Sequence, residues 1–168
     1  MVFRCALAFC LLAFPLYSQS AGKAGILSPA DIEYLMPPQV FFHSQTSSVQ
    51  LRNSAGIRYT DGLITMAGMV DTSGYSSSQR ETYQFYLLTD VPLRVGDQRL
   101  VPGAYGCGFV NGQDFVVMDL GGSTVLHEPV EHDPSMVHPR PLQMTAATSA
   151  DAVRLYLGRA FVILTRSK

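Results

Sequence analysis

The residues of this chain best suited to chemistry lie in one short segment, His127-Glu128-Pro129-Val130-Glu131-His132-Asp133, followed by His138. The segment holds three of the four histidines and three carboxylates within twelve residues. Imidazole and carboxylate groups together bind zinc and similar divalent ions, so His127, His132, His138 and Glu131 are the candidate metal ligands. A metal-dependent hydrolase that uses residues 127–138 is therefore one functional hypothesis.

The spacing of these residues does not specify a metal site. The metalloprotease motif His-Glu-x-x-His places both histidines on one face of a helix. Here His127 and His132 are five residues apart, and Pro129 and Pro134 interrupt any regular helix. The simpler interpretation is a solvated, proline-rich loop that links the central strands to the last ones. We therefore expect no cofactor, with a divalent metal as the alternative.

Other catalytic patterns are missing from the sequence. A serine nucleophile on a tight turn would sit in Gly-x-Ser-x-Gly, and neither residues 74–78 nor residues 121–123 fit that pattern. There is no phosphate-binding glycine loop, dinucleotide fingerprint or Cys-x-x-Cys motif. Cys107 lies between two glycines in an apolar stretch, which favours a small buried side chain over a reactive thiol. Paired carboxylates stay open, because the fold alone brings them together.

Binding without catalysis is the function that these exclusions leave. Tyrosine is favoured at contact surfaces, and Tyr75, in the polar loop 71–79, is the tyrosine we expect to be exposed. We expect the other tyrosines in the core, and for Tyr105 a ligand contact is the alternative. Tyr75 and Tyr105 are thus the candidate ligand-binding residues. We predict a binding or interaction module for a hydrophobic small molecule or an envelope protein, with a structural envelope role as a third hypothesis.

The first twenty residues predict export. Arg4 supplies a positive charge, residues 5–16 are apolar and uncharged, and Ser18 and Ser20 offer small residues at the −3 and −1 positions of a cleavage site. The apolar run is shorter than the ~20 residues of a membrane-spanning helix. We expect residues 1–20 to be a cleaved signal peptide, with no transmembrane span after cleavage and a secreted or periplasmic location.

The charge of the chain bears on its partners, and its length on its domain organisation. The net charge is −1, and the arginines are scattered singly along the chain. A nucleic-acid-binding protein would show a basic stripe, so we expect no nucleic-acid partner. Residues 21–38 are predicted to form an N-terminal extension and residues 39–168 a single domain. We expect a monomer or a weak oligomer.

The N-terminal extension is predicted to contain one short helix. Ser28 can cap the helix, Pro29 suits its first position, and Asp31 is favoured near its positive end. Pro37 and Pro38 must end the helix after Met36.

The remainder of the chain is predicted to form short strands joined by tight turns. Asn-Gly, Gly-Asp and Gly-Gly pairs supply the positive φ angles that two-residue hairpin turns require. The predicted turns lie at Ser54-Ala55-Gly56, Gly96-Asp97, Asn111-Gly112, Gly121-Gly122 and Gly158-Arg159. We predict an all-β fold, mainly an antiparallel meander, that forms a sandwich or a small barrel.

Two segments carry further structural information. Residues 78–81 resemble a helical capping box, whereas Tyr83, Phe85 and Leu87 alternate as in a strand, and we favour the strand for residues 79–90. The last hairpin, residues 153–165, is apolar on both faces. Such a hairpin belongs in the middle of a packed structure or at a surface that covers something else.

Residues 82–119 include an alternating strand, a turn at Gly96 and the segment Leu100-Val101-Pro102-Gly103-Ala104-Tyr105. This arrangement resembles small exported bacterial β domains of uncharacterised function that contain a Leu-Pro-Ala-Gly-x-Tyr hairpin. Here the order is Val-Pro-Gly-Ala, and the Arg/Trp-containing segment of those domains has no counterpart, since the chain has no tryptophan. The resemblance implies an exported β fold and no particular activity.

Overall fold

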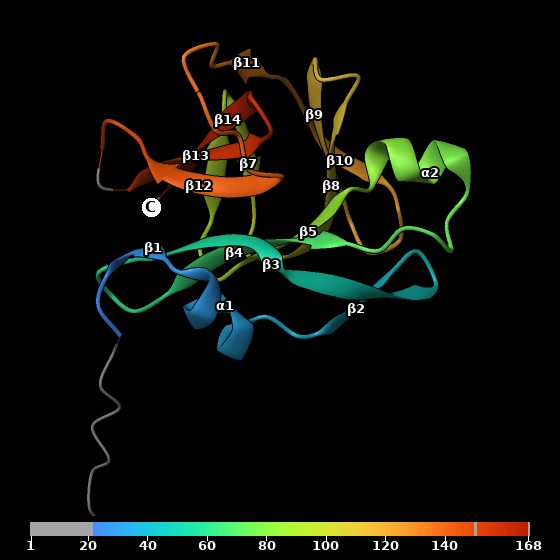
Figure 1. The fold of residues 1–168 in the computed structure, drawn as a ribbon, viewed down its shortest axis with the longest axis horizontal. Helices are drawn as coiled ribbons and strands as arrows, with labels where there is room; N and C mark the ends of the chain where they lie inside the picture. Colours follow the sequence, from blue (N-terminus) through green and yellow to red (C-terminus); the bar gives the residue numbers. More distant parts are fainter. Residues whose placement is uncertain (1–21, 150, 168) are drawn as a thin grey trace, which may run out of the picture.

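The computed structural model describes residues 22–149 and 151–167, and in them two antiparallel sheets dominate (Figure 1). The predicted signal peptide, residues 1–20, lies outside the described residues. The larger sheet has the strand order β1-β3-β4-β5-β8-β9-β10, and β2 pairs with β3. Its strands are β1 (Gly25–Leu27), β2 (Gln39–Phe42), β3 (Gln45–Arg58), β4 (Ile64–Val70), β5 (Phe85–Thr89), β8 (Gly103–Val110), β9 (Asp114–Met118) and β10 (Thr124–Pro129).

The smaller sheet has the order β12-β13-β14-β6-β7, and β11 pairs with β14. Its strands are β6 (Leu93–Val95), β7 (Gln98–Leu100), β11 (Glu131–His132), β12 (Leu142–Ala146), β13 (Ala152–Leu157) and β14 (Ala160–Arg166). The β6–β7 hairpin therefore leaves the larger sheet after β5 and joins the strands of the C-terminal hairpin. The predicted all-β class is confirmed.

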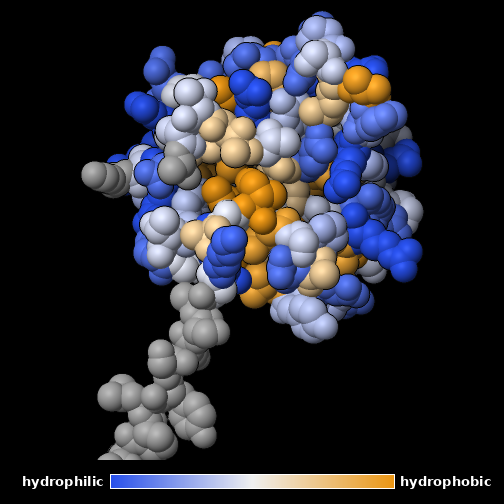
Figure 2. All heavy atoms as spheres, turned by 60° about the vertical axis from the view of Figure 1, so that its left-hand side comes forward, coloured by the Kyte–Doolittle hydropathy of each residue, from blue (hydrophilic) through white to orange (hydrophobic). Residues whose placement is uncertain are grey.

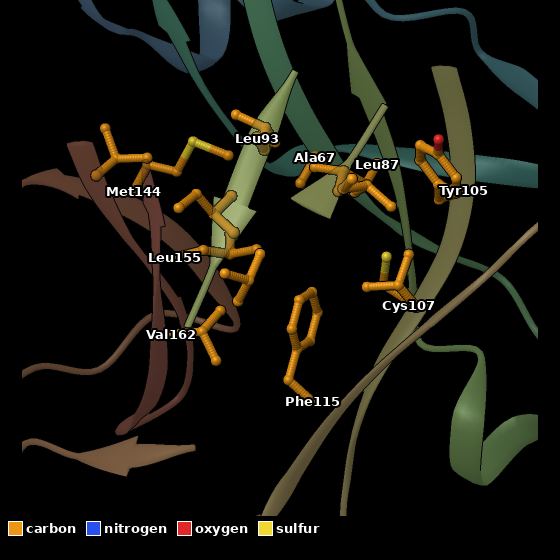
Figure 3. Close-up of a cluster of buried hydrophobic side chains, with 14 of the residues drawn as sticks. Ala67, Leu87, Leu93, Tyr105, Cys107, Phe115, Met144, Leu155 and Val162 are labelled. Atoms are coloured by element: carbon orange, nitrogen blue, oxygen red, sulfur yellow. The ribbon is translucent and has the colours of Figure 1, made fainter. Parts of the chain in front are cut away.

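The two sheets pack face to face as a sandwich, the first of the two predicted architectures. Apolar side chains from both inner faces meet between them (Figure 3). Phe115 and Leu87 of the larger sheet and Leu155 of the smaller one are fully buried there. Burying one such side chain stabilises the fold by about 1.5–3 kcal/mol. Cys107 is part of this core, as predicted, and burial raises the pKa of its thiol well above the ordinary value.

The C-terminal hairpin, β13–β14, has the central position that its two apolar faces predicted. Strand β14 lies between β13 and β6. Val153, Leu155 and Leu164 are fully buried.

Helix α1 (Pro29–Leu35) begins where the sequence predicts it. The Asp31 amide donates to Ser28 Oγ at 3.2 Å, and the Ser28 amide donates to Asp31 Oδ2 at 2.9 Å. The helix ends at Leu35, with Met36 as its C-cap residue. Ile32 and Met36 are buried on the outer face of the larger sheet, so α1 covers part of that face.

The turn predictions at Gly96, Asn111-Gly112, Gly122 and Gly158 are confirmed, and all five residues have positive φ. The prediction of a turn at Ser54-Ala55-Gly56 is wrong. These residues lie within β3 and pair with Gly68, Ala67 and Met66 of β4. The register shifts between Gln50 and Ser54, so an irregularity inside one long strand takes the place of the turn.

Residues 79–90 contain a helix and then a strand. Helix α2 (Ser77–Thr82) has Ser76 as its N-cap residue, not Ser78, and Gln79 completes the capping box. Strand β5 follows, as the alternation predicted. Neither helix of the described residues is long and apolar enough to cross a membrane.

Candidate functional site: an apolar cleft beside helix α1

The outer face of the larger sheet has a second apolar cluster, separate from the core between the sheets. Helix α1, the hairpin of β2 and β3, and the segment before α2 lie over this face and bury their apolar side chains against it (Figure 1). This cover is incomplete, because α1 is short and ends at Leu35. Where the cover ends, the outer face is open.

The covered part of the face includes one row of residues that run across β4, β5 and β8, namely Gly68, Tyr86 and Gly106. The two glycines let the cover approach closely. The Phe42 ring occupies the place that a Cβ at Gly106 would take. A Cβ at Gly68 would lie 2.7 Å from Val49. We call these three residues the glycine row.

The next row across the same three strands is Met66, Leu88 and Ala104. Side chains two residues apart on a strand point to the same face, so this row also belongs to the outer face. Its members form the floor of an open cleft, and we call them the cleft row. Ile64, two residues before Met66, extends the floor.

The cleft has a volume of about 880 Å³. Its apolar lining comes from the end of α1, the turn before β4, and strands β4, β5 and β8. The apolar side chains that line it include Leu35, Leu63, Ile64, Met66, Leu88 and Ala104.

Two polar residues, Thr89 and Asp90, also line the cleft. Thr89 directly follows the cleft-row residue of β5, so its side chain points to the opposite, inner face of the sheet. The Thr89 hydroxyl is satisfied within the protein, because it lies 2.9 Å from the Thr65 hydroxyl and donates to the Val91 carbonyl at 2.8 Å. Asp90 is exposed, and its Oδ2 accepts a hydrogen bond from the Ile64 amide at 3.1 Å. Asp90 therefore brings a carboxylate to an otherwise mostly apolar site.

Apolar side chains are exposed around the cleft as well as within it. Leu35 is 38% exposed and Leu63 39%, and Val101, adjacent to the lining residue Pro102, is 60% exposed. Figure 2 shows a face of the molecule on which apolar side chains gather in a central area bordered by polar residues. Contiguous apolar surface of this kind is typical of ligand or partner sites.

The prediction that Tyr75 is exposed is wrong. The side chain is 6% exposed and packs edge-on against Tyr83, with the ring centroids 5.2 Å apart. Its hydroxyl accepts from Ser47 Oγ at 2.9 Å and donates to the Phe42 carbonyl at 3.0 Å. These bonds fold the polar loop back onto β2 and β3, so Tyr75 has a structural role.

Tyr105 is in the core, as predicted. It is 7% exposed, belongs to the cluster between the sheets, and donates its hydroxyl to the Val101 carbonyl at 2.8 Å. Its neighbour Ala104 is in the outer apolar cluster and lines the cleft. Tyr105 itself is not part of that lining.

The predicted metal ligands are not brought together. Within the described part of the chain, no three histidine, cysteine, aspartate or glutamate side chains converge to hold a metal ion. His127 Nε2 lies 3.5 Å from Asp114 Oδ1. His132 and Glu131 lie on β11, and His138 is exposed in the following loop.

The predicted loop at residues 127–138 is only partly a loop. Residues 127–129 belong to β10 and pair with β9, and Glu131 and His132 pair with β14. Asp133 begins the loop proper. It accepts hydrogen bonds from Ser135 and Tyr156, and the bond from Ser135 is the main reason why its pKa is lowered.

The cleft residues are not among the candidate site residues that the sequence predicts. A signal was present in β5, where Leu87 and Leu88 are adjacent, which makes both faces of that strand apolar. A second signal was the pair Pro37-Pro38, which limits how far α1 can cover the sheet. Neither shows that Met66 and Ala104 align with Leu88.

Comparison of the chain with protein-family models, curated proteins and solved structures finds no match in any of the three. The resemblance of residues 82–119 to small exported domains therefore stays a prediction.

Proposed function

We propose that the protein is an exported, non-catalytic binding module that holds a hydrophobic small molecule in the cleft beside α1. One observation carries the proposal, namely the open cleft of about 880 Å³ floored by the cleft row. Ligand sites in proteins commonly enclose about 300–1,000 Å³, with mostly apolar walls and few polar groups. The lining described here has that composition.

The other two hypotheses receive less support. A purely structural role predicts an exposed apolar face without a pocket, whereas this face is hollowed. A metal-dependent hydrolase needs imidazoles that converge with a carboxylate around an open position. The histidines of residues 127–138 are separated on β10, β11 and the following loop.

Export is the second part of the proposal and rests on the first twenty residues alone. Their charge, apolar run and small residues match a secretory signal. A ligand-binding module outside the cytoplasm would meet hydrophobic molecules in the periplasm or the surrounding medium. We propose no nucleic-acid partner, since the arginines form no stripe in the sequence.

A fluorescence titration with the neutral hydrophobic probe N-phenyl-1-naphthylamine tests the binding function. We expect saturable binding by residues 21–168. The variant Leu35→Asp puts a charge on the wall of the cleft, and desolvating that charge against an apolar ligand should weaken binding by about ten-fold or more.

Tyr34→Asp is the matched control, since Tyr34 is the adjacent residue of α1, is 92% exposed and does not line the cleft. We expect this variant to bind the probe as the unchanged protein does. Absence of saturable binding, or equal loss in both variants, would contradict the proposed function. Circular dichroism of both variants shows whether the fold is kept.

A further inference from the structure

We propose, on the basis of the proposed function, that the natural ligand is an amphipathic amine whose ammonium group pairs with Asp90. The cleft then recognises two parts of one molecule. The cleft row receives the apolar part, and the Asp90 carboxylate receives the charged part.

The strand register places the two parts of the site side by side. Leu88, in the middle of the cleft row, pairs with Met66 on one side and Ala104 on the other. Asp90 follows Leu88 by two residues, just after the end of β5, and its amide donates to the Ile64 carbonyl at 2.9 Å. Two residues of extended chain span about 6.6 Å, so the carboxylate lies one row away from the apolar floor. A short ligand reaches both.

One oxygen of the exposed Asp90 carboxylate is held by the protein, and the other is accessible to a ligand. Oδ2 of Asp90 accepts from the Ile64 amide at 3.1 Å, which fixes the orientation of the group. In the described part of the chain no side chain forms an ion pair with Asp90 and no group donates to its Oδ1. An ammonium group has three donors and full positive charge, so it satisfies this oxygen better than a neutral hydroxyl does.

The charge of the lining argues against an anionic ligand. Among the described residues that line the cleft, Asp90 is the one with a charged side chain, and none is a lysine, arginine or histidine. A fatty acid would place its carboxylate near that of Asp90, where the like charges repel. Fatty acids are therefore disfavoured relative to amines of the same chain length.

The test is competition against N-phenyl-1-naphthylamine by three ligands with the same eight-carbon chain: octylammonium, octanol and octanoate. At pH 7 a primary alkylamine is protonated, as the lysine amine is. Exposed ion pairs contribute about 0.2–1 kcal/mol. We therefore expect octylammonium to displace the probe at about 1.4- to 5-fold lower concentration than octanol, and octanoate to be the weakest competitor.

The variant Asp90→Asn separates charge from shape, because the asparagine carbonyl can still accept from the Ile64 amide. We expect it to abolish the preference for octylammonium over octanol, measured as the ratio of the two displacing concentrations. Asp97→Asn is the control. Asp97 is exposed in the turn between β6 and β7 and does not line the cleft, and its substitution changes the net charge equally.

The possible failures are distinguishable. Equal displacement by octylammonium and octanol, or a preference that survives in Asp90→Asn, overturns the amine inference and leaves the proposed function in place. A preference lost equally in Asp97→Asn assigns it to net charge and also overturns the inference. If the unchanged protein binds neither the probe nor any of the three ligands, the proposed function itself fails.

Discussion

The ring of Phe42 lies on Gly106, in the space that a Cβ at position 106 would fill. Phe42 is 2% exposed and stacks on Tyr83 with the ring centroids 4.0 Å apart. The hairpin of β2 and β3 is thereby held against β8. This contact also marks the boundary of the cleft, because Ala104, two residues before Gly106, lies in its floor.

Replacing Gly106 with alanine should destabilise the fold. The added methyl group has to displace the buried Phe42 ring, and overpacking of this kind costs about 1–3 kcal/mol. Chemical denaturation measures the change. Gly74→Ala is the control, because there a Cβ would meet only the end of the Gln45 side chain, at 3.3 Å. We expect the control to stay within about 0.5 kcal/mol of the unchanged protein.

Loss of the hydroxyl group should change the stability of the fold differently at two neighbouring buried tyrosines, Tyr75 and Tyr83. Tyr75→Phe removes hydrogen bonds to Ser47 and to the Phe42 carbonyl, so we expect a loss of about 1–3 kcal/mol. The Tyr83 hydroxyl forms no hydrogen bond of ordinary geometry among the described residues, and burial raises its pKa, an effect that the nearby Ser47 hydroxyl only partly offsets. Tyr83→Phe should therefore leave stability unchanged or raise it.

The same denaturation experiment compares the two tyrosine variants. Equal destabilisation by both would mean that the Tyr83 hydroxyl has a partner. Neither residue lines the cleft, so binding of the hydrophobic probe should be unchanged in both variants. Loss of probe binding in Tyr75→Phe alone would restore the ligand-binding role that the sequence suggested.

Acid should weaken the contact between Asp61 and Arg166. Arg166 Nη2 lies 2.6 Å from Asp61 Oδ2, and this hydrogen bond is the main reason why the pKa of Asp61 falls below its ordinary value of 3.8. A carboxylate with a lowered pKa in the folded state stabilises the fold above its unfolded pKa. This stabilisation is lost as the pH falls below about 3.8 and through the lower folded value.

The measurement is the difference in stability between pH 6 and pH 2.5. We expect a smaller difference in Asp61→Asn than in the unchanged protein, because asparagine does not titrate. Asp97→Asn is a suitable comparison and should keep the full difference. An unchanged difference in Asp61→Asn would show that the ion pair contributes nothing in solution.

Zinc titration tests the histidine segment directly. We expect no stoichiometric binding by the unchanged protein and no change in thermal stability in the double variant His127→Ala/His132→Ala. The reason is geometric, since the two imidazoles lie on different strands and the His127 side chain is 58% exposed. Stoichiometric zinc that the double variant loses would favour the hydrolase instead.

The position of signal cleavage is a separate prediction. When the full chain is expressed in a bacterium with a secretory pathway, intact-mass analysis should find an exported protein that begins at Ala21. Retention of an uncleaved chain in the cytoplasm would contradict export. It would not bear on the binding test, which uses the folded domain.

Helix starts and tight turns could be predicted from the sequence, because they depend on residues that are neighbours in the chain. Ser28 and Pro29 start a helix because they act on the adjacent backbone, and the Asn111-Gly112 turn forms because both residues accept positive φ. The prediction for residues 54–56 was wrong because small residues, which are common in turns, also let a long strand pack closely against side chains of the strands paired on either side of it. Gly56 of β3 pairs with Leu27 of β1 and Met66 of β4, and a Cβ there would lie 3.1 Å from each of their side chains.

Long-range relationships could not be predicted in this way. Tyr75 is surrounded in sequence by serine and glycine, yet it is buried by bonds to residues about thirty positions earlier. The cleft depends on the register of β4, β5 and β8 and on the length of α1. Leu88 by itself is an apolar strand residue, and only its pairing with Met66 and Ala104 makes it part of a site.

The central place of β14 in the smaller sheet has a consequence for synthesis. On one side β6 pairs with β7, which follows it directly. On its other side Leu93 and Arg94 pair with Arg166 and Thr165, which are synthesised some seventy residues later. A nascent chain that stops before β14 lacks the strand that joins β12 and β13 to the β6–β7 hairpin, so the smaller sheet cannot form as one sheet over the larger one. The apolar inner face of the larger sheet therefore gains its complete cover only when the C-terminal hairpin has been synthesised.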